Sequence, residues 1–216
     1  MIDKLQDALL TPADTARYLG IPRSTMYSWL AEKAAGAPLV HTVPPAKRGW
    51  PSVPFVAVIE AYVLRSLREL KLGKDKIRDV AAEIRNVLGN PYGLADRRIA
   101  TDGIDVFVHY MDTDELARAD DRQMPIREVI SDYLNYIVWE PSDAYPARLR
   151  LRQYPDTAQV VIDPRFGWGA PVVARTKVPV EAVVGMWRAG ESSETVADEY
   201  GLTVDEVEAV VRVAAW

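Results

Sequence analysis

The stretch from Leu10 to Lys33 constrains the fold more than any other part of the 216-residue chain. Its letters, LTPADTARYLGIPRSTMYSWLAEK, place a capping residue, Thr11, directly before Pro12, which suits the first position of a helix. Asp14 stands where a carboxylate can complete a capping box. Gly20 then supplies a turn residue that is free to take a positive φ. The stretch therefore predicts two short helices joined by a tight turn.

The second of these helices is expected to carry its apolar residues, Met26, Trp29 and Leu30, at helical spacing. This is the pattern of a helix-turn-helix motif, in which the second helix enters the DNA major groove with its first residues nearest the bases. An ordinary helical hairpin that touches no DNA is the alternative, because small residues and aliphatic plugs also suit helix pairs. On the helix-turn-helix interpretation, the DNA-reading residues are Arg23, Ser24, Thr25, Tyr27 and Ser28.

A basic turn with an aromatic residue follows at positions 44–50, PPAKRGW. Winged helix-turn-helix proteins place a phosphate-contacting loop at this point, so Lys47 and Arg48 are expected to contact the DNA backbone. With "TPADTARYLGIPRSTMYSWL", this turn and the later "LRELKLGKDKIRDV" make the segment from Leu10 to about Leu88 resemble the MerR-like winged helix-turn-helix. The resemblance implies binding to promoter DNA, and it makes the last of these runs the turn into the next helix.

The charge of the chain is divided between its two halves. The net charge is -5, but residues 1–90 carry +4 and residues 91–216 carry -9. A basic front half can meet phosphates, whereas an acidic back half is repelled by them and must serve another partner. The sequence has no cysteine, and no apolar run approaches the roughly 20 residues that span a bilayer. We therefore expect a cytoplasmic protein with no membrane partner.

Two helices are expected after the wing. The first is predicted to be capped by Ser52 and ended by Gly73, and the second to run from Lys74 to Leu88. The apolar stripe of the second helix is a candidate dimer seam, and a symmetric homodimer is expected of a protein that reads DNA half-sites. Its cations are interpreted as a solvated face rather than a DNA surface; they are Lys74, Lys76, Arg78 and Arg85.

The middle of the chain mixes turns and short elements. Alternating apolar residues around positions 101–103 predict a β-hairpin, and the acidic run at 112–121 predicts an exposed loop rather than a metal site. A helix is expected over residues 126–136. The alternation at 147–152 and the run at 159–163 predict a small sheet. Its arginines, Arg148, Arg150 and Arg152, are expected to pair with the acidic loop, with a phosphate site as the alternative.

The back end carries the second informative stretch. Helices are expected over residues 180–189, 193–200 and 203–213. The run "IDPRFGWGAPVVARTKVPVEAVVGMWRAGESSETVADEYGLTVDEVEAVV" closely resembles a small bacterial domain of formally unknown function that occurs in antitoxins of type II toxin-antitoxin systems. Coupled to the winged front, the chain resembles a VapB-type antitoxin of the mycobacterial kind. This resemblance implies a PIN-domain ribonuclease toxin, VapC, as partner and autoregulation of the operon.

The C-terminus has a helix-turn-helix outline of its own. Ala197 and Gly201-Leu202 repeat the spacing of Ala16 and Gly20-Ile21. Between Glu191 and Arg212, however, there are seven carboxylates and one arginine, so phosphate binding is unfavourable there. We expect this copy of the scaffold to serve protein contact.

The expected fold class is mainly α with small β elements (α+β). Three regions are predicted: a MerR-like winged helix-turn-helix domain at residues 1–90, a connecting region with short strands and a helix at 91–156, and a C-terminal antitoxin-associated helical domain at 157–216. With two histidines and no cysteine, the commonest catalytic groups are nearly absent. We expect a binding protein without catalytic residues, metal or cofactor. The alternative is a stand-alone MerR-like regulator whose back half senses a small molecule.

The resemblance also implies how a toxin would be blocked. PIN-type nucleases hold a divalent metal among carboxylates, and an inserted guanidinium can bind such oxygens bidentately. Arg165 and Arg175 are preferred for this role over the strand arginines, because turns can protrude. For Phe166 and Trp168, core packing is the preferred interpretation, and a partner hot spot is the alternative. The expected toxin-binding residues are therefore Arg165, Phe166, Trp168 and Arg175.

Overall fold

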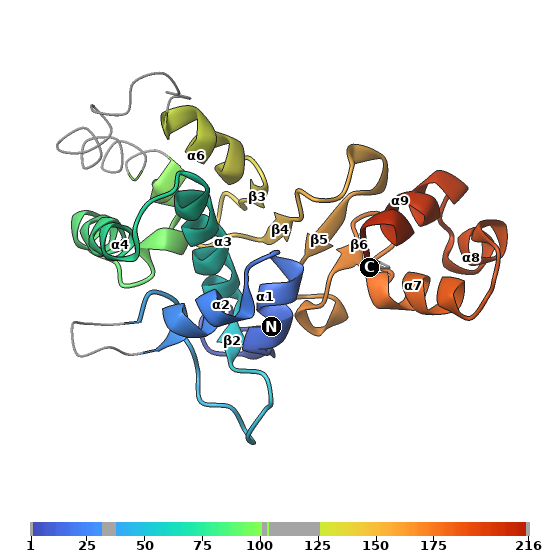
Figure 1. The fold of residues 1–216 in the computed structure, drawn as a ribbon, viewed down its shortest axis with the longest axis horizontal. Coiled ribbons are helices and arrows are strands. Elements are labelled where there is room, and N and C mark those ends of the chain that lie inside the picture. The colour runs from blue at the N-terminus through green and yellow to red at the C-terminus, as the bar shows by residue number, and fades with distance from the viewer. Residues whose placement is uncertain (1, 32–37, 101–102, 104–125, 215–216) are drawn as a thin grey trace. The chain divides into compact units, whose positions relative to one another are not determined.

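The computed structural model describes residues 2–31, 38–100, 103 and 126–214. They form two compact units, which we call the front unit (residues 3–147) and the back unit (residues 148–216 with the first two residues). Helices with small antiparallel sheets confirm the α+β class (Figure 1). The predicted division of the chain into three regions, with boundaries at residues 90 and 156, stays a prediction. The expected β-hairpin strand at residues 104–109 and the acidic loop at 112–121 lie outside the described residues.

The front unit is built around α3 (Phe55–Glu69). Every residue from Phe55 to Leu64 is buried, as expected of a helix that is apolar on all sides. Just before it, β2 (Val53–Pro54) pairs antiparallel with β1 (Ala8–Leu10). This pairing holds the chain extended up to Pro54, which is the N-cap residue of α3. The expected cap at Ser52 is therefore wrong.

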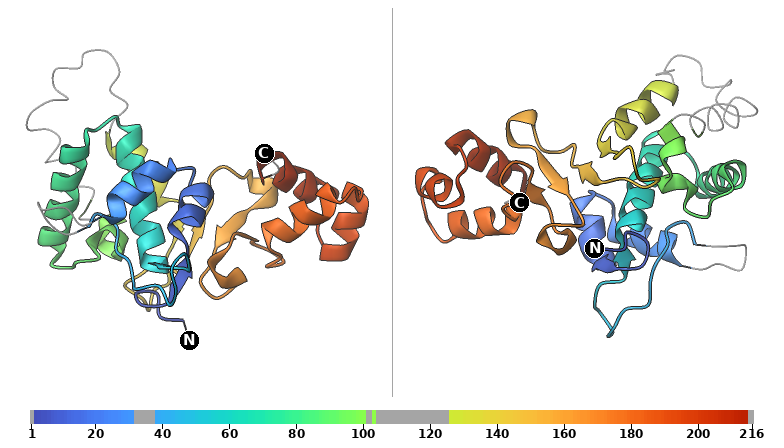
Figure 2. Two further views of the ribbon diagram at one scale, coloured as in Figure 1. Left: turned by 60° about the horizontal axis from the view of Figure 1, so that its bottom comes forward. Right: turned by 180° about the vertical axis from the view of Figure 1, so that it is seen from behind.

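Helices from both sides of α3 in the sequence pack around it (Figures 1 and 2). They are α1 (Pro12–Tyr18), α2 (Arg23–Leu30), α4 (Lys74–Leu88), α6 (Ile126–Leu134) and the short 3-10 turns η1 (Gly93–Ala95) and η2 (Arg97–Ala100). The apolar stripe of α4 is 0–5% exposed within this core, so it is not available as a dimer seam. It consists of Ile77, Val80, Ala81, Ile84 and Leu88.

The residues after position 90 belong to the same core. The ring of Tyr133 on α6 lies 5.3 Å from that of Tyr62 on α3, measured between centroids. The short strand β3 (Ile137–Val138) follows α6. Lys4, near the N-terminus, forms an ion pair of 2.7 Å with Asp143. The front unit therefore needs the described residues of 91–100 and 126–147 to complete its packing.

The back unit combines a small sheet with three helices. The strands β4 (Arg148–Arg150), β5 (Val160–Ile162) and β6 (Val172–Val173) are antiparallel, with Leu149 opposite Ile162 and Val161 opposite Val172. The helices, α7 (Val180–Arg188), α8 (Ser193–Tyr200) and α9 (Val204–Ala214), begin and end within one residue of the expected bounds. A 3-10 turn, η4 (Asp156–Ala158), packs against α9.

The pair α8–α9 repeats the pair α1–α2 at a constant offset of 181 positions in the sequence. In both pairs the turn glycine has φ near 60° and the residue after it donates its backbone N–H to an alanine carbonyl, at 2.8 and 2.9 Å. This confirms the C-terminal helix-turn-helix outline. The matching pairs are Thr11 and Ser192, which are the caps, then Ala16 and Ala197, Gly20 and Gly201, Ile21 and Leu202, Met26 and Val207, and Trp29 and Val210.

Candidate nucleic-acid interface and partner-binding turn

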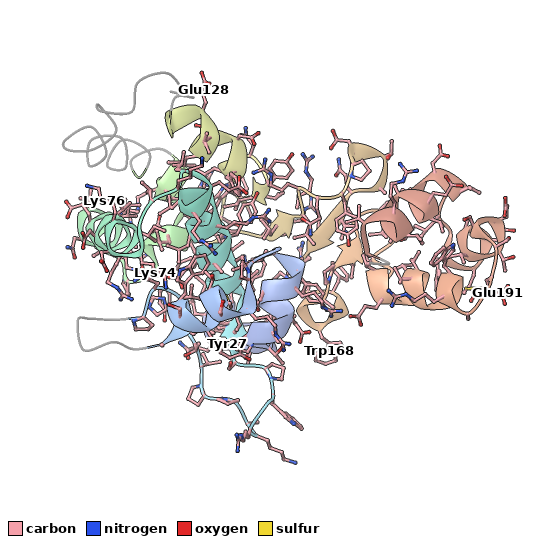
Figure 3. All side chains as sticks on the ribbon, viewed as in Figure 1. Tyr27, Lys74, Lys76, Glu128, Trp168 and Glu191 are labelled. Atoms are coloured by element: carbon pink, nitrogen blue, oxygen red, sulfur yellow. The ribbon has the colours of Figure 1, made fainter. Side chains whose placement is uncertain are left out.

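Helix α2 separates a buried face from an exposed one. Met26 is fully buried and Trp29 is 4% exposed, so these two side chains fix the helix against the front unit. Arg23 and Ser24 are exposed on its first turn, and Tyr27, one turn later, is 51% exposed (Figure 3). The N-cap residue is Pro22, and no acidic residue lies in the first turn. The outward face therefore offers cationic and hydroxyl groups where a recognition helix meets base edges.

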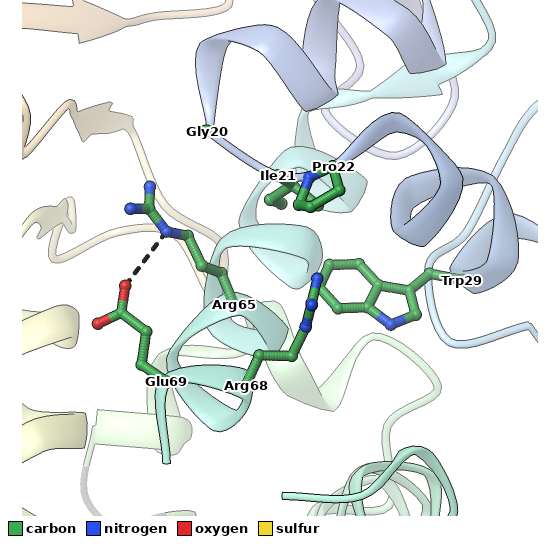
Figure 4. A pocket seen from close by; sticks show the side chains of 7 residues that line it. All are labelled: Gly20, Ile21, Pro22, Trp29, Arg65, Arg68 and Glu69. Carbon is green, nitrogen blue, oxygen red and sulfur yellow. Dashed lines mark ion pairs between the residues drawn. The ribbon is translucent and has the colours of Figure 1, made fainter. Parts of the chain in front are cut away.

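Thr25 and Ser28 are half-buried rather than outward-facing. The hydroxyl of Thr25 accepts a hydrogen bond of 2.8 Å from Arg68 at the end of α3. Arg65, one turn earlier on α3, donates to the carbonyl of Leu19, beside the turn that separates α1 from α2. Figure 4 shows Arg65 near this turn, with its ion pair of 3.5 Å to Glu69. These two arginines therefore hold the recognition helix and its turn on α3. The sequence signals neither role, because the partners lie more than 40 residues apart.

The wing is a loop closed at its base by backbone hydrogen bonds. Val43 donates to the carbonyl of Ser52 at 2.9 Å, and Trp50 donates to that of Lys47 at 3.0 Å. Lys47 and Arg48 are exposed at the tip, and the Lys47 ammonium lies 5.2 Å from the centroid of the Trp50 ring. The two cations that are expected to contact phosphates are therefore carried by a loop of defined conformation.

A buried carboxylate connects the start of this loop to the core. Glu60 on α3 is fully buried and accepts hydrogen bonds from the backbone N–H of His41 at 2.9 Å and from Nη2 of Arg85 at 3.0 Å. The His41 ring nitrogen Nδ1 lies 2.8 Å from the same carboxylate. Arg85 also donates to the carbonyls of Pro38 and Leu39, at 3.1 and 2.8 Å. Both oxygens of the Glu60 carboxylate thus accept hydrogen bonds, which offsets the cost of burying its charge. Among the residues that the structure describes, Nε of Arg85 is buried without a hydrogen-bond partner.

The cations of α4 do not form one solvated face. Arg85 is committed to Glu60, as described above. Lys74 and Arg78 are one helical turn apart and line a small pocket together with Asp75 and with Ser28 of α2. Lys76 lies between them in the sequence and on the opposite side of the helix, pointing away from α2 (Figure 3). The interpretation as a solvated face is therefore corrected for Arg85, and Lys74 and Arg78 border α2.

The back unit carries an unusual turn at Phe166–Gly169. Gly167, Trp168 and Gly169 have successive φ values of 59°, 53° and 83°. Gly169 donates its backbone N–H to Phe166 at 3.2 Å, and Ala170 donates to Gly167 at 2.9 Å. The segment is thus a single left-handed turn. The Trp168 side chain is 88% exposed and points away from the ribbon (Figure 3), so the core-packing alternative is wrong for this residue.

Both loop arginines have carboxylate partners inside the back unit. Arg165 donates from Nε and Nη2 to the two oxygens of Asp163, at 3.0 and 2.9 Å. Arg175 does the same with Glu206 on α9, at 3.2 and 2.6 Å, and also donates to the Gly201 carbonyl. The strand arginines were expected to pair with acidic residues, and the loop arginines prove to have such partners as well, so acidic partners do not distinguish the two groups. On the strand, Arg150 pairs with Asp156 at 3.4 Å.

These contacts shift the ionisation of the carboxylates. Burial by itself raises the pKa of Asp163, but hydrogen bonds from Arg165 outweigh it, and the pKa lies below its usual range. Hydrogen bonding from Arg175 is the largest cause that lowers the pKa of Glu206. Both carboxylates are therefore ionised at neutral pH, and each holds its arginine as an ion pair.

In residues 2–31, 38–100, 103 and 126–214, no three His, Asp or Glu side chains are grouped to hold a metal ion. The same ranges contain no helix with the length and apolar character that a membrane crossing requires.

Comparison with known families defines the class of protein first. Residues 8–81 match the family described as "Putative DNA-binding HTH domain", and residues 160–214 match the family described as "Protein of unknown function (DUF433)". The chain is thus a helix-turn-helix protein with an additional C-terminal domain. The first match covers α1, α2, the wing and α3, and the second covers the left-handed turn and all three helices of the back unit.

Relatives that match over nearly the whole chain then define the family. "Putative antitoxin VapB45" of Mycobacterium tuberculosis is 33% identical over 220 residues, which cover 92% of this chain and 90% of that protein. The crystal structure of Rv2018 from Mycobacterium tuberculosis has a TM-score of 0.82 at 30% identity, covering 97% of this chain and 100% of that one. This chain belongs to the VapB45 family of antitoxins.

Proposed function

We propose that this protein is an antitoxin that represses its own operon by binding promoter DNA and neutralises a PIN-domain ribonuclease toxin by direct binding. The observation that carries the proposal is the exposed, acid-free first turn of α2 beside a basic wing, in a chain of an antitoxin family. The acidic back half supports a division of labour, because it is unsuited to phosphate contact.

DNA binding would use two kinds of contact. Arg23, Ser24 and Tyr27 are exposed on α2 and would read base edges, with Thr25 and Ser28 closer to the helix axis. Lys47 and Arg48 on the wing would contact phosphates, which fix the register without reading the sequence. Lys74 and Arg78 would add phosphate contacts beside α2. A homodimer would place two such surfaces on a palindromic operator.

Toxin neutralisation would use the back unit. We propose Arg165, Phe166, Trp168 and Arg175 as the toxin-binding residues, because all four lie on turns and none is fully buried. For an arginine to enter the metal site of a PIN nuclease, it must exchange its own carboxylate for those of the toxin. The exchange costs no electrostatic free energy only if the toxin's carboxylates offer the guanidinium at least as many aligned oxygens as its own carboxylate partner does.

The test is co-expression of this chain with the PIN-domain protein encoded beside it, followed by purification and a ribonuclease assay. A stable complex in which the nuclease is inactive is the expected result. Arg175→Ala should release activity more than Arg150→Ala does. Because Arg175→Ala also breaks a pair within the unit, Glu206→Gln is the matched control. If both changes release activity equally, Arg175 acts by stabilising the back unit and does not enter the toxin.

A promoter-binding assay separates this function from that of a ligand-sensing regulator. Occupancy of the promoter by an antitoxin should change when the purified toxin is added. If occupancy instead responds to a small-molecule extract and not to any neighbouring gene product, the antitoxin function is rejected.

A further inference from the structure

The conformation of Trp168 is one that its side chain does not favour. In a left-handed turn the Cβ atom of an L-residue crowds the following carbonyl oxygen, so such turns are normally left to glycine. Glycine occupies the positions on both sides, and the central position with φ 53° and ψ 34° is nevertheless tryptophan. The fold would be more stable with glycine there as well. A strained residue that persists indicates a requirement other than folding.

Exposure removes the usual reason for keeping a tryptophan. An 88% exposed side chain buries almost no apolar area, so it contributes little to the stability of the back unit. Trp187 on α7 is 40% exposed and thus packs against its own unit to a much greater extent. Tryptophan is, however, the residue type most enriched among the energetic centres of protein interfaces.

The turn is fixed before any partner arrives. Phe166 donates its backbone N–H to the carbonyl of Asp163 at 3.0 Å, and the Asp163 side chain is fully buried. A Cβ on Gly167 would lie 2.8 Å from Cγ1 of Val172, so position 167 has no room for a side chain. A side chain displayed on a rigid turn loses little backbone entropy on binding, which favours affinity.

Two cations lie beside Phe166, at the start of the turn, in a unit that is otherwise acidic. The Arg165 guanidinium and the Lys177 ammonium lie 5.8 and 5.2 Å from the centroid of the Phe166 ring. By contrast, the segment from Glu191 to Arg212 holds seven carboxylates and one arginine. A surface with an apolar centre and positive rim is complementary to an apolar pocket edged by carboxylates. Single-stranded RNA could also stack on tryptophan, but the acidic remainder of the unit would repel it.

We infer that the turn Phe166–Gly169 is a preformed docking knob, that Trp168 is its anchor, and that the toxin receives it in an apolar pocket with a carboxylate rim. This inference rests on the proposed function and deepens it. Arg165 then stays on Asp163 and contributes charge to the rim of the contact. Docking therefore begins with the tryptophan, before any arginine leaves its own carboxylate partner.

The experiment compares four full-length variants in binding to the purified PIN-domain protein encoded by the neighbouring gene. Trp168→Ala and Trp168→Gly should each weaken binding about 100-fold, as expected of a central tryptophan. Trp187→Ala is the control and should bind as the wild type does. Lys177→Gln should weaken binding at low salt and have little effect at high salt.

A stability measurement accompanies the binding assay. Trp168→Gly relieves the backbone strain, so the melting temperature should rise by roughly 4 °C, while Trp168→Ala should leave it nearly unchanged. Stabilisation combined with loss of binding would show that the tryptophan serves the partner and not the fold. A fall in the melting temperature of Trp168→Gly would contradict the inference.

The outcomes separate the inference from the proposed function. If Trp168→Ala binds the toxin as tightly as the wild type, the knob is rejected and the antitoxin function stands. If the wild-type chain does not bind the PIN-domain protein, the antitoxin function itself is rejected. If Trp168→Ala instead loses binding to a single-stranded uridine 10-mer, the turn is a nucleic-acid contact and the inference is overturned.

Discussion

Arg23 lies exposed on the first turn of α2, where a guanidinium can donate two hydrogen bonds to a guanine edge. We predict that Arg23→Ala lowers the affinity for the operator by about 1–3 kcal/mol and relaxes the preference at one base pair. Fluorescence anisotropy with the operator and its single-base variants measures both effects. Arg17→Ala on α1 is the control, because Arg17 already pairs with Asp14 at 3.4 Å. Equal losses on all sequences would make Arg23 a phosphate contact.

The stability of the front unit depends on pH through Asp96. It is 3% exposed; burial raises its pKa, but hydrogen bonds from Arg98 and Asn90 outweigh this and lower the pKa from 3.8 to about 2. Because the folded-state value lies below the unfolded one, the stabilisation is complete above about pH 4 and is lost as the pH falls toward 2. At neutral pH it amounts to about 2 kcal/mol.

We therefore predict that Asp96→Asn destabilises the protein at pH 7 and that the difference from wild type shrinks at pH 3. Urea unfolding at the two pH values measures it, and Asp79→Asn, on the exposed side of α4, is the control. A difference that stays constant with pH would mean that the Asp96 charge makes no contribution.

Sequence periodicity at the residue scale distinguished the inner face of α2 from the outer one. Met26 and Trp29 are buried and Tyr27 is exposed, as the 3.6-residue spacing predicts. The spacing carried no information about the partners of arginines. Arg175 finds Glu206 31 positions away, and the pair forms only when α9 packs near the loop. The same limit applies to Arg68 and Thr25, which are 43 positions apart.

The wing acts as one element, because its tip cations are carried by a closed loop. We predict that replacing Lys47 and Arg48 together by glutamine weakens binding to every DNA sequence alike. The slope of log affinity against log salt should fall by about two, since each lost phosphate contact removes roughly 0.9. Titrations at several salt concentrations give the slope. Lys76→Gln, on the side of α4 away from α2, should leave it unchanged. A changed base preference with an unchanged slope would contradict the prediction.

Elements with strong local signals were predicted well. The cap at Thr11 forms as expected, although Asp14 accepts a hydrogen bond of 2.6 Å from the Thr11 hydroxyl in place of the cap amide. Helix starts set by long-range pairing were not. Ser52 looks like a cap, but the pairing of Pro54 with Ala8, 46 positions earlier, decides where α3 begins. The left-handed turn at Trp168 has no local signal beyond its flanking glycines.

The size of the front unit sets a prediction for the whole molecule. Leu94 and Tyr133 are 0 and 1% exposed against the core around α3, so a chain ending at residue 90 would leave that surface open to water. We predict that a fragment of residues 1–147 is soluble and binds promoter DNA without neutralising the toxin. A fragment of residues 1–90 should aggregate. Size-exclusion chromatography and anisotropy test both. Toxin neutralisation by the 1–147 fragment would reject the assignment of that role to the back unit.

The repeated helix pair gives the chain two copies of one scaffold with opposite charge. Where the front copy has Ser24, Thr25 and Tyr27, the back copy has Asp205, Glu206 and Glu208. A protein with two basic copies could bridge distant DNA segments and would leave the chromosome slowly. On the proposed function only the front copy would contact DNA, so non-specific residence would be short and the search for a single operator fast. If the proposed function holds, the back copy would be free to bind newly made toxin while the front copy is on the promoter.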